Sequence, residues 1–492
     1  MTGRRLESPA RTERPDATFT FDGRRYTAPD GEPLAVALLA ADRPVISRSF
    51  RFHRPRGLMC DTGQCGWCEC EVDGRPSVRA CQVPVRTGLA ARSEHAWPTA
   101  QRDLLGILDL GARLIPPTFY HHRFLRPRVL RKRYLDVIRG FGGRGRLRIR
   151  GTADGAGARP ARTALHLETD VLVVGGGRSG VAAAERAAAG GHRVVLVEAV
   201  RGRAAPAGEI RVLDGATAVG WYDGVVSAID DETLWSIRAS SIVAATGSYE
   251  RVPSVRGADR PGVMGARLVE RLVTEHRVLP GQHPLLVGDE TDLVPVREAL
   301  IAVGVRPVGT VKTAALRRVL GRRRVTGALV DIDGRLIRES TDLVVFGERT
   351  PNLDLALAAG AAVETRDRTL VPVLDEGGRT SVPALLVVGS ATGRSAAARS
   401  SAGAPAKGRS IVCFCEDVHA DELHAQVASG YGDPELVKRR TGALTGPCQG
   451  KYCLQAFTCA LADAGAPIDR LPTARPPLRP TRLADLVPRD QT

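Results

Sequence analysis

The chain of 492 residues has a formal net charge of +16, 43% apolar residues and only 4% aromatic residues. This length exceeds what one hydrophobic core supports and predicts several domains. Most of the positive charge comes from arginines scattered through the whole sequence, without stacking aromatics or a recognition motif, so no nucleic-acid partner is expected. No stretch approaches the about 20 apolar residues of a membrane span, and the N-terminus has no apolar signal-peptide core, which predicts a cytoplasmic protein.

The first 96 residues predict a small domain that consists mainly of β structure. Residues 19–26 alternate in polarity around an Asp-Gly turn and predict a β-hairpin. Residues 33–41 predict a short helix, and residues 69–81 predict a second hairpin. A loop rich in glycine connects the helix to this second hairpin.

This loop begins a pattern of four cysteines in C-x4-C-x2-C spacing, with the fourth thirteen residues further on. They are Cys60, Cys65, Cys68 and Cys81. The spacing is typical of plant-type [2Fe-2S] domains, in which a loop gives three thiolates and a distant strand gives the fourth. A four-cysteine zinc site is the alternative, but its usual paired C-x2-C knuckles are absent. Cys70 is expected to be buried without binding the metal centre. The alternative is that it replaces Cys68 as a ligand, because both residues lie on the same face of the strand.

A connector and linker are expected over residues 97–166. Residues 98–140 contain helical patterns and a basic stretch with aromatic residues. A helical connector is the preferred interpretation, and contact with a membrane surface is the alternative. Residues 141–162 are rich in Gly, Arg and Ala and predict a linker.

The central part of the chain begins with a dinucleotide-binding pattern. An apolar strand is expected at residues 171–174 and a second at residues 194–197, with an alanine-rich helix between them. The turn between strand and helix reads G-x-G-x-x-G, and its expected binding residues are Gly175, Gly177, Ser179 and Gly180. Glu198 ends the second strand, where an acid accepts hydrogen bonds from an adenosine ribose. The order of strand, turn, helix, strand and acid therefore predicts a bound dinucleotide.

Two later turns fit the same site. A strand at residues 242–245 ends in Thr246 and Gly247, and an A-T-G turn at this distance from the first pattern supports an FAD site. The segments 342–347 and 384–393 are expected to return to the FAD domain. The second of them contains Gly389 and Ser390, where many flavoproteins have Gly-Asp, so the contact of the acid with the ribityl chain is neutral or lost.

A second strand-turn-helix unit is expected at residues 283–305. Only Gly288 of the glycine pattern is present there. Asp289, Glu290 and Asp292 put carboxylates where a pyrophosphate needs amide groups, so like-charge repulsion disfavours NAD(P)H in the usual pose. The unit is expected to be structural, and a nucleotide held in a different way is the alternative.

The C-terminal part contains a second set of four cysteines in the pattern C-x-C…C-x4-C. They are Cys413, Cys415, Cys448 and Cys453. Two helical segments, residues 420–430 and 433–443, separate the two halves of the pattern. The layout resembles the ligand pattern of bacterioferritin-associated ferredoxin domains, which implies a [2Fe-2S] cluster, and zinc is the competitor. Cys459 lies outside the pattern and is expected to pack in a helix.

Taken in order, these parts resemble the α-subunit family of heterotetrameric sarcosine oxidases and its relatives, the amino-acid and opine dehydrogenases and hydrogen cyanide synthase. The similarity is carried by HRPRGLMC, YERVPSVRGADRPGVM, HRVLPG, VVGSATG and, most distinctly, ELVKRRTGALTGPCQGKYC. Two features differ from sarcosine oxidases proper: the chain ends at Thr492 without their folate-binding half, and all eight cluster cysteines are present. Both differences point to the dehydrogenase and cyanide-synthase side of the family.

The resemblance implies a multidomain α/β fold. Its parts are a plant-type ferredoxin β-grasp domain (1–96), a disulfide-reductase-like FAD domain with two dinucleotide-binding units (167–404), a small helical cysteine-cluster domain (405–470) and a tail (471–492). The degenerate second nucleotide domain is expected as an insertion at about 260–340.

The implied function is that of an electron-transfer subunit in a heteromeric amine or amino-acid dehydrogenase or oxidase. The implied cofactors are FAD and two [2Fe-2S] clusters, with room for FMN at a subunit interface. The implied partner is a flavoprotein like glycine or D-amino-acid oxidase, which would oxidise the C–N bond, and no catalytic acid or base is expected in this chain. The alternatives are a self-contained NAD(P)H:acceptor oxidoreductase and a mainly structural subunit.

Overall fold

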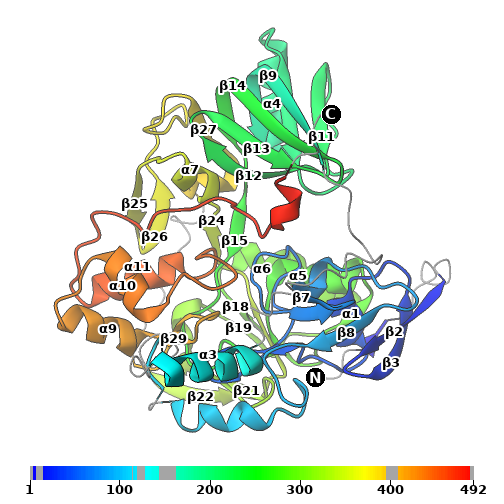
Figure 1. Ribbon diagram of the computed structural model, residues 1–492, viewed down its shortest axis with the longest axis vertical. Helices are drawn as coiled ribbons and strands as arrows, with labels where there is room; N and C mark the ends of the chain where they lie inside the picture. The colour runs from blue at the N-terminus through cyan, green and yellow to red at the C-terminus, as the bar shows by residue number, and fades with distance from the viewer. Residues whose placement is uncertain are drawn as a thin grey trace. The chain divides into compact units, whose positions relative to one another are not determined.

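The computed structural model describes residues 4–6, 15–112, 115–118, 128–142, 162–394 and 408–487 (Figure 1). The chain divides into two compact units, each made of three separate segments. Unit 1 comprises Met1–Thr152, Glu250–Glu348 and Ser401–Leu471, and unit 2 comprises Ala153–Tyr249, Arg349–Ser400 and Pro472–Thr492. Most of the expected linker, residues 143–161, lies outside the described residues.

Unit 2 contains a seven-stranded sheet with the order β11-β10-β9-β14-β13-β12, in which β27 also pairs with β14. Figure 1 labels most of these strands beside helix α4. The elements are β9 (Thr163–Val174), α4 (Arg178–Ala189), β10 (Val194–Glu198), β11 (Ile210–Asp214), β12 (Thr217–Tyr222), β13 (Val225–Ile229), β14 (Thr233–Ala244) and β27 (Leu385–Val387).

The strands β11, β10, β9, β14 and β27 are all parallel. Every residue of β10 is buried, as are the last four residues of β9, which explains their continuous apolar sequence. The chain leaves β9 toward β10 on one side and returns through β14 on the other side. Ligands of open parallel sheets bind at such a switch point, beyond the carboxyl ends of the strands.

The N-terminal part of unit 1 forms a five-stranded sheet with the order β3-β2-β8-β6-β7. Its elements are β2 (Asp16–Phe21), β3 (Arg24–Pro29), α1 (Leu34–Ala40), β6 (Glu69–Val72), β7 (Arg75–Arg79), η2 (Ala80–Gln82) and β8 (Ala90–Ser93). Both expected hairpins and the short helix are confirmed. One expectation is corrected, because Cys81 lies in the short 3-10 helix η2 directly after β7 and not in a strand.

A parallel sheet with the order β16-β23-β18-β19 forms the second part of unit 1. Its elements are β16 (Val263–Gly265), α5 (Ala266–Thr274), β18 (Pro284–Val287), α6 (Glu290–Ala302), β19 (Gly309–Val311) and β23 (Leu343–Phe346). The sequence assigned β23 to the FAD domain. That assignment is wrong, since β23 pairs with β16 and β18.

A three-stranded antiparallel sheet of β20 (Leu316–Leu320), β21 (Gly327–Ile332) and β22 (Arg335–Glu339) also belongs to unit 1. Helices α1, α5 and α6 contribute Leu38, Leu272 and Leu300, among others, to one continuous hydrophobic core. This core joins the N-terminal sheet to the parallel sheet.

The C-terminal cysteine segment begins with a short hairpin, β28 (Ile411–Cys413) and β29 (Val418–His419). Helices α9 (Ala420–Ala428) and α10 (Pro434–Thr441) confirm the two expected helices. A third helix, α11 (Leu454–Asp463), follows the last cysteine of the pattern and was not predicted as a separate element. Apolar residues of the three helices form a core of their own, which includes Cys413, Cys448 and Cys453.

The connector differs in part from its prediction. Residues 101–114 have a helical pattern, but the structure has only the 3-10 helix η3 (Leu104–Asp109) there, and residues 113–114 lie outside the described residues. Helix α3 (Arg128–Gly142) follows, whereas residues 119–127 of the basic stretch are not described. No helix among the described residues has the length and apolar character to cross a membrane.

The remaining short elements are β1 (Arg4–Arg5), β4 (Ser47–Arg48), β5 (Pro55–Arg56), β15 (Ser248–Glu250), β17 (Val278–Leu279), η5 (Thr313–Ala315), β24 (Arg349–Pro351), α7 (Asp354–Ala358), β25 (Val363–Arg366), β26 (Thr369–Pro372), η6 (Gly389–Thr392) and η7 (Leu483–Asp485).

Candidate cofactor-binding sites

The four cysteines of the N-terminal pattern lie together in unit 1, and all of them are buried. Cys60 and Cys65 are hydrogen-bonded to each other, and so are Cys68 and Cys81. The tertiary structure therefore brings the fourth cysteine to the loop that carries the other three. Four buried thiols without a disulfide form a donor set suited to an iron–sulfur cluster or a zinc ion.

Polar groups around this set point toward its sulfur atoms. The backbone N–H of Trp67 donates to Cys65 Sγ at 3.4 Å, and the Thr62 hydroxyl donates to Cys60 Sγ at 3.6 Å. The Gln82 side-chain amide lies 3.7 Å from Cys81 Sγ. The hydrogen bond from Cys65 is the main cause that lowers the pKa of Cys60, to about 6. These donors stabilise the thiolate form that binds metal.

The C-terminal set is compact as well; three of its cysteines are buried, and Cys415 is half-buried. Cys413 lies in β28, and Cys453 directly precedes α11; their sulfur atoms are 3.8 Å apart. Two thiolates at about 2.3 Å from one tetrahedral ion lie at about this separation. Hydrogen bonds from Cys415 and Cys453, with the backbone N–H groups of residues 450 and 452, hold the pKa of Cys448 well below its usual range.

Two cysteines lie outside both sets, as the sequence suggested. Cys70 is in β6 within the hydrophobic core of unit 1, where burial raises the pKa of its thiol. Cys459 is a buried residue of α11. Their role as bystanders stays a prediction.

The glycine turn of unit 2 is closely packed, and two of its glycines are required by that packing. A Cβ on Gly175, which has φ +109°, would lie 2.3 Å from the carbonyl oxygen of Ala245. A Cβ on Gly180 would lie 1.8 Å from the carbonyl oxygen of Gly175. Helix α4 can approach the ends of β9 and β14 only because both residues lack a side chain.

The N-terminus of α4 is open. Its N-cap residue, Gly177, gives no side-chain hydrogen bond to the first turn, so the helix N–H groups there are not capped by that residue. Apart from its two chain neighbours, the described residues place only the Arg203 guanidinium within 4 Å of a Cβ built on Gly177, at 3.9 Å. An uncapped helix end with a nearby guanidinium suits an anion such as a diphosphate.

Glu198 ends β10 as predicted and is buried. One of its carboxylate oxygens accepts a hydrogen bond from Gly176 N at 2.5 Å, and the other accepts one from Val200 N at 2.7 Å. The carboxylate therefore holds the glycine turn against the end of the second strand.

The other predicted residues of unit 2 gather at the ends of β14 and β27. Gly247 has φ +79°, and a Cβ there would lie 4.0 Å from Ser390 Oγ. A Cβ on Gly389 would lie 2.6 Å from Ser179 Oγ, which connects this turn to α4. Thr246 donates its hydroxyl hydrogen to the carbonyl oxygen of Asn352 at 3.1 Å. Asn352 was not predicted as a site residue, because a single asparagine after a short strand has no recognisable pattern.

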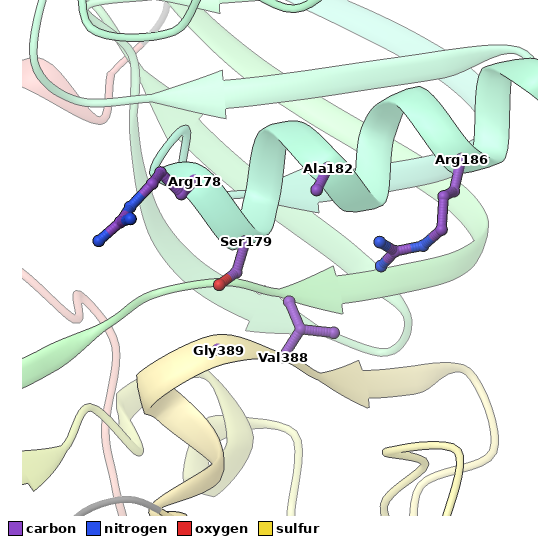
Figure 2. Close-up of a pocket in the computed structure, with 6 residues that line it drawn as sticks. All are labelled: Arg178, Ser179, Ala182, Arg186, Val388 and Gly389. Atoms are coloured by element: carbon purple, nitrogen blue, oxygen red, sulfur yellow. The ribbon is translucent and has the colours of Figure 1, made fainter.

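A pocket of about 510 Å³ lies along α4 (Figure 2). Figure 2 shows Ser179 pointing from the helix toward the ribbon at Gly389. The lining residues are Arg178, Ser179, Ala182, Arg186, Val388 and Gly389. The sequence identified only Ser179 and Gly389 among them. The helical spacing of residues 179, 182 and 186 indicates one face, but only the fold shows that this face meets the turn after β27.

The helix of the second strand-turn-helix unit has a capped N-terminus. Asp289 is the N-cap of α6, and its side chain accepts a hydrogen bond from Thr291 N at 2.9 Å. Glu290 in the first turn pairs with Arg297. The helix end is thus capped and acidic, which disfavours a nucleotide diphosphate in the usual pose; that no nucleotide binds here in this pose stays a prediction.

Comparison with known proteins finds two family models, and each matches a segment that contains one of the two cysteine sets. Residues 15–96 match the family model of a 2Fe-2S iron-sulfur cluster binding domain, and residues 407–488 match that of the sarcosine oxidase A3 domain. Hydrogen cyanide synthase subunit HcnA of Pseudomonas aeruginosa is 33% identical over 81 residues, which are 16% of this chain and 77% of HcnA. The chain belongs to the family of sarcosine oxidase α subunits and their relatives.

The longest of these similarities is to the sarcosine oxidase α subunit of Rhizobium meliloti. This protein is 28% identical over 539 residues, covering 88% of this chain and 53% of the relative. This member of the family therefore spans about half the length of that relative, and about a third of the α subunits of two Corynebacterium strains.

A solved structure shares the fold of nearly the whole chain. L-proline dehydrogenase from P. horikoshii has a TM-score of 0.71 and 19% sequence identity, and the match covers 99% of this chain and 100% of that one. The predicted multidomain α/β fold with an iron–sulfur domain and a dehydrogenase-like flavoprotein fold is confirmed at this level.

Proposed function

We propose that this chain is the FAD- and iron–sulfur-containing electron-transfer subunit of a heteromeric flavin-dependent dehydrogenase or oxidase that acts on amines or amino acids. Electrons would come from a partner flavoprotein and leave to an acceptor that the sequence does not identify. The relatives are named as single subunits of sarcosine oxidase and opine oxidase, and these names support both the substrate class and a multisubunit assembly.

One observation carries this proposal. A single chain holds an open dinucleotide turn in unit 2 and two compact four-cysteine sets in unit 1. A bound flavin supplies the exchange between two-electron and one-electron transfer, and iron–sulfur clusters carry electrons singly. These two kinds of site together are what an electron-transfer subunit needs.

The proposed FAD ligands are the residues around the ends of the parallel strands. They are Gly175, Gly177, Ser179, Gly180, Glu198, Thr246, Gly247, Gly389 and Ser390. The open end of α4 would bind the diphosphate through main-chain N–H groups, and the glycines would allow its close approach. Glu198 would orient the adenosine ribose while it holds the turn in place.

The proposed cluster ligands are the eight cysteines of the two sets. The N-terminal ligands are Cys60, Cys65, Cys68 and Cys81, and the C-terminal ligands are Cys413, Cys415, Cys448 and Cys453. Burial of seven of these residues limits the access of water, and nearby N–H and O–H groups stabilise the negative charge on sulfur. Zinc in the C-terminal set is the competing occupant.

The proposed partner is a flavoprotein subunit like glycine or D-amino-acid oxidase, and the proposed location is the cytoplasm. FMN at the interface with that subunit completes the proposed cofactor set. This chain would then contribute no acid or base to the oxidation of the C–N bond.

A self-contained NAD(P)H:acceptor oxidoreductase is the first rival function. The capped and acidic end of α6 argues against it, because the Asp289 carboxylate already accepts a hydrogen bond from the first turn and would repel a diphosphate. A mainly structural subunit is the second rival. The intact cysteine sets argue against it, since a scaffold has no need for eight clustered thiols that could each bind metal.

The proposal is tested by co-purification of the tagged chain with the product of a neighbouring gene, under anaerobic conditions. Absorption and EPR spectra, with iron, zinc and flavin analysis, then give the cofactors per chain. We expect a single FAD and two [2Fe-2S] clusters per chain, and reduction by an amine or amino acid only in the presence of the partner. Reduction by NADH alone would favour the first rival, and a colourless chain after iron reconstitution would favour the second.

A further inference from the structure

The two cysteine sets are in contact with each other within unit 1. Cys415 Sγ lies 3.8 Å from the backbone carbonyl oxygen of Cys65, although the two residues are 350 positions apart in the chain. Next to this contact, the rings of Trp67 and Phe414 have their centroids 5.3 Å apart. Each of these aromatic residues is adjacent to a cysteine of its own set, so the two candidate centres are neighbours.

Two arginines, the buried Arg56 and the half-buried Arg79, form hydrogen bonds between the two loops. Arg56 donates to the carbonyl oxygen of Phe414 at 3.1 Å and to Asp417 Oδ1 at 2.6 Å. Arg79 donates to the carbonyl oxygen of Pro447 at 3.1 Å. These bonds involve residues within a few positions of cysteines from both sets. The contact is therefore a built interface and not a chance approach of two loops.

A glycine permits the closest part of this interface. Gly66, between Cys65 and Cys68, has φ +72°, and a Cβ on it would lie 2.7 Å from Pro447 Cβ. Pro447 directly precedes Cys448. Any side chain at position 66 would push the two sets apart.

Tyr452 contacts both sets. It belongs to the C-x4-C loop of the C-terminal set, where its backbone N–H is hydrogen-bonded to Cys448. Its side chain extends to the N-terminal set, where its hydroxyl is hydrogen-bonded to Cys60 and the Thr62 hydroxyl lies near both groups. The ring packs against two hydrophobic cores of unit 1, one that includes Cys60 and Cys65 and one that includes the helices of the C-terminal set.

We propose that the two cysteine sets act as one two-centre unit, in which Tyr452 is a positioning residue that donates its hydroxyl hydrogen to Cys60 Sγ of the neighbouring centre. This inference rests on the proposed function, because it requires a redox centre at the N-terminal set. The Thr62 hydroxyl, 3.6 Å from Cys60 Sγ, is a second donor to the same sulfur.

The physical consequence is a change in reduction potential. Reduction adds one negative charge to a cluster, and hydrogen bonds to its sulfur ligands stabilise that charge. Tyr452 therefore raises the potential of the N-terminal centre from a position in the C-terminal loop. A change in the C-terminal loop would then alter the reduction potential of the neighbouring centre without any change in the four ligands of that centre.

The test is an EPR-monitored redox titration of the full chain with the substitution Tyr452→Phe, which removes the hydroxyl and keeps the ring. The signal that is lost on Cys81→Ser substitution identifies the N-terminal centre. We expect a shift of that centre to more negative potential, and a smaller shift in the same direction for Thr62→Val. Tyr431→Phe is the matched control, because it removes a hydroxyl from the same C-terminal segment, where the Arg440 guanidinium covers its ring.

An unchanged potential of the N-terminal centre in Tyr452→Phe, in a chain that keeps its thermal stability, overturns the inference. Equal shifts in Tyr452→Phe and Tyr431→Phe would also overturn it, since they would indicate a general effect. The proposed function fails separately: zinc in the C-terminal set or the lack of a flavoprotein partner contradicts it, while the potential of the N-terminal centre still tests Tyr452. A chain that binds no cluster at all contradicts both.

Discussion

The two strand-turn-helix units of this protein have similar local architecture, but they differ in the capping of the helix N-terminus. The N-cap residue of α4 is Gly177, which provides no side-chain cap, and the Arg203 guanidinium lies nearby. The N-cap residue of α6 is Asp289, whose carboxylate accepts a hydrogen bond from the first turn of the helix. A strand, a turn and a helix therefore do not by themselves make an anion site. The charge and hydrogen-bonding state of the first turn decide whether an anion can bind.

The largest effect is expected from adding a side chain in the glycine turn that precedes α4. In Gly180→Ala the new Cβ would lie 1.8 Å from the Gly175 carbonyl oxygen, so helix and turn must separate. We expect the flavin content per chain to fall to less than about a tenth of the parent value, as measured by absorption after extraction. Gly309→Ala, at an uncrowded position in β19 of unit 1, is the control, and this variant should keep its flavin. Full flavin content in Gly180→Ala would contradict the assignment of the anion site to α4.

A third helix end shows how a carboxylate stabilises a first turn. Glu422 of α9 accepts a hydrogen bond from His419 N at 2.9 Å and pairs with the buried Arg51. Burial alone would raise the pKa of Glu422, but the bonds from His419 and Arg51 outweigh it and lower the pKa to about 2. Because the folded-state pKa is below the unfolded value, the ionised group stabilises the fold above about pH 4 to 5, and this stabilisation is lost as the pH falls toward 2.

The corresponding prediction concerns Glu422→Gln. A difference of about two pKa units corresponds to about 3 kcal/mol of unfolding free energy at neutral pH. We expect the variant to be less stable than the parent by about this amount at pH 7, and the difference to shrink as the pH is lowered. Urea unfolding between pH 3 and pH 7 measures it. A difference that stays constant with pH contradicts the assignment of the effect to ionisation of Glu422.

A charge placed at the open helix end tests the contrast between the two units directly. Gly177→Asp gives α4 the same residue that caps α6, and its carboxylate repels a diphosphate. We expect FAD to bind at least about tenfold more weakly, which corresponds to about 1.4 kcal/mol. Gly177→Ala is the size control, because a Cβ there meets no atom closer than 3.9 Å and φ is −71°. Equal losses in both variants would assign the effect to size and not to charge.

The smallest effect is expected from Arg203, because its side chain is exposed. Arg203→Ala removes one cation near the helix end, which is worth about 1 kcal/mol or less at an exposed position. We expect FAD affinity to fall by about fivefold or less at low salt, with a smaller difference at high salt. Arg201→Ala in the same loop is the control, since that guanidinium is paired with Asp231 at 2.7 Å. The two variants should differ in a fluorescence titration with FAD.

The patterns that the sequence revealed are those with short spacing. The glycine turn, the acid at Glu198 and both cysteine spacings lie within continuous segments, so residue type and position suffice to recognise them. The hairpins at the N-terminus and the helices α9 and α10 were found for the same reason. The complete domain boundaries and the assignment of individual ligands stay predictions.

The errors share one cause as well. Segment 342–347 has the apolar sequence of any buried parallel strand, and its pairing with β16 and β18 depends on long-range contacts. Residues 104–109 have helical spacing, yet they form a 3-10 helix in a connector that also contains glycines. Periodicity identifies a type of element but not its partners or its exact winding.

Local sequence was enough to identify the types of site in this protein: a dinucleotide turn, two four-cysteine sets and a second turn whose acidic residues disfavour a diphosphate. Each of these depends on groups that are near one another in the chain. The tertiary structure was needed to show that the two cysteine sets meet, that Tyr452 of one set reaches Cys60 of the other, and that α4 is left uncapped. The physical reason is that buried ion pairs such as Arg56 with Asp417 join segments separated by hundreds of residues, and no local pattern encodes that pairing.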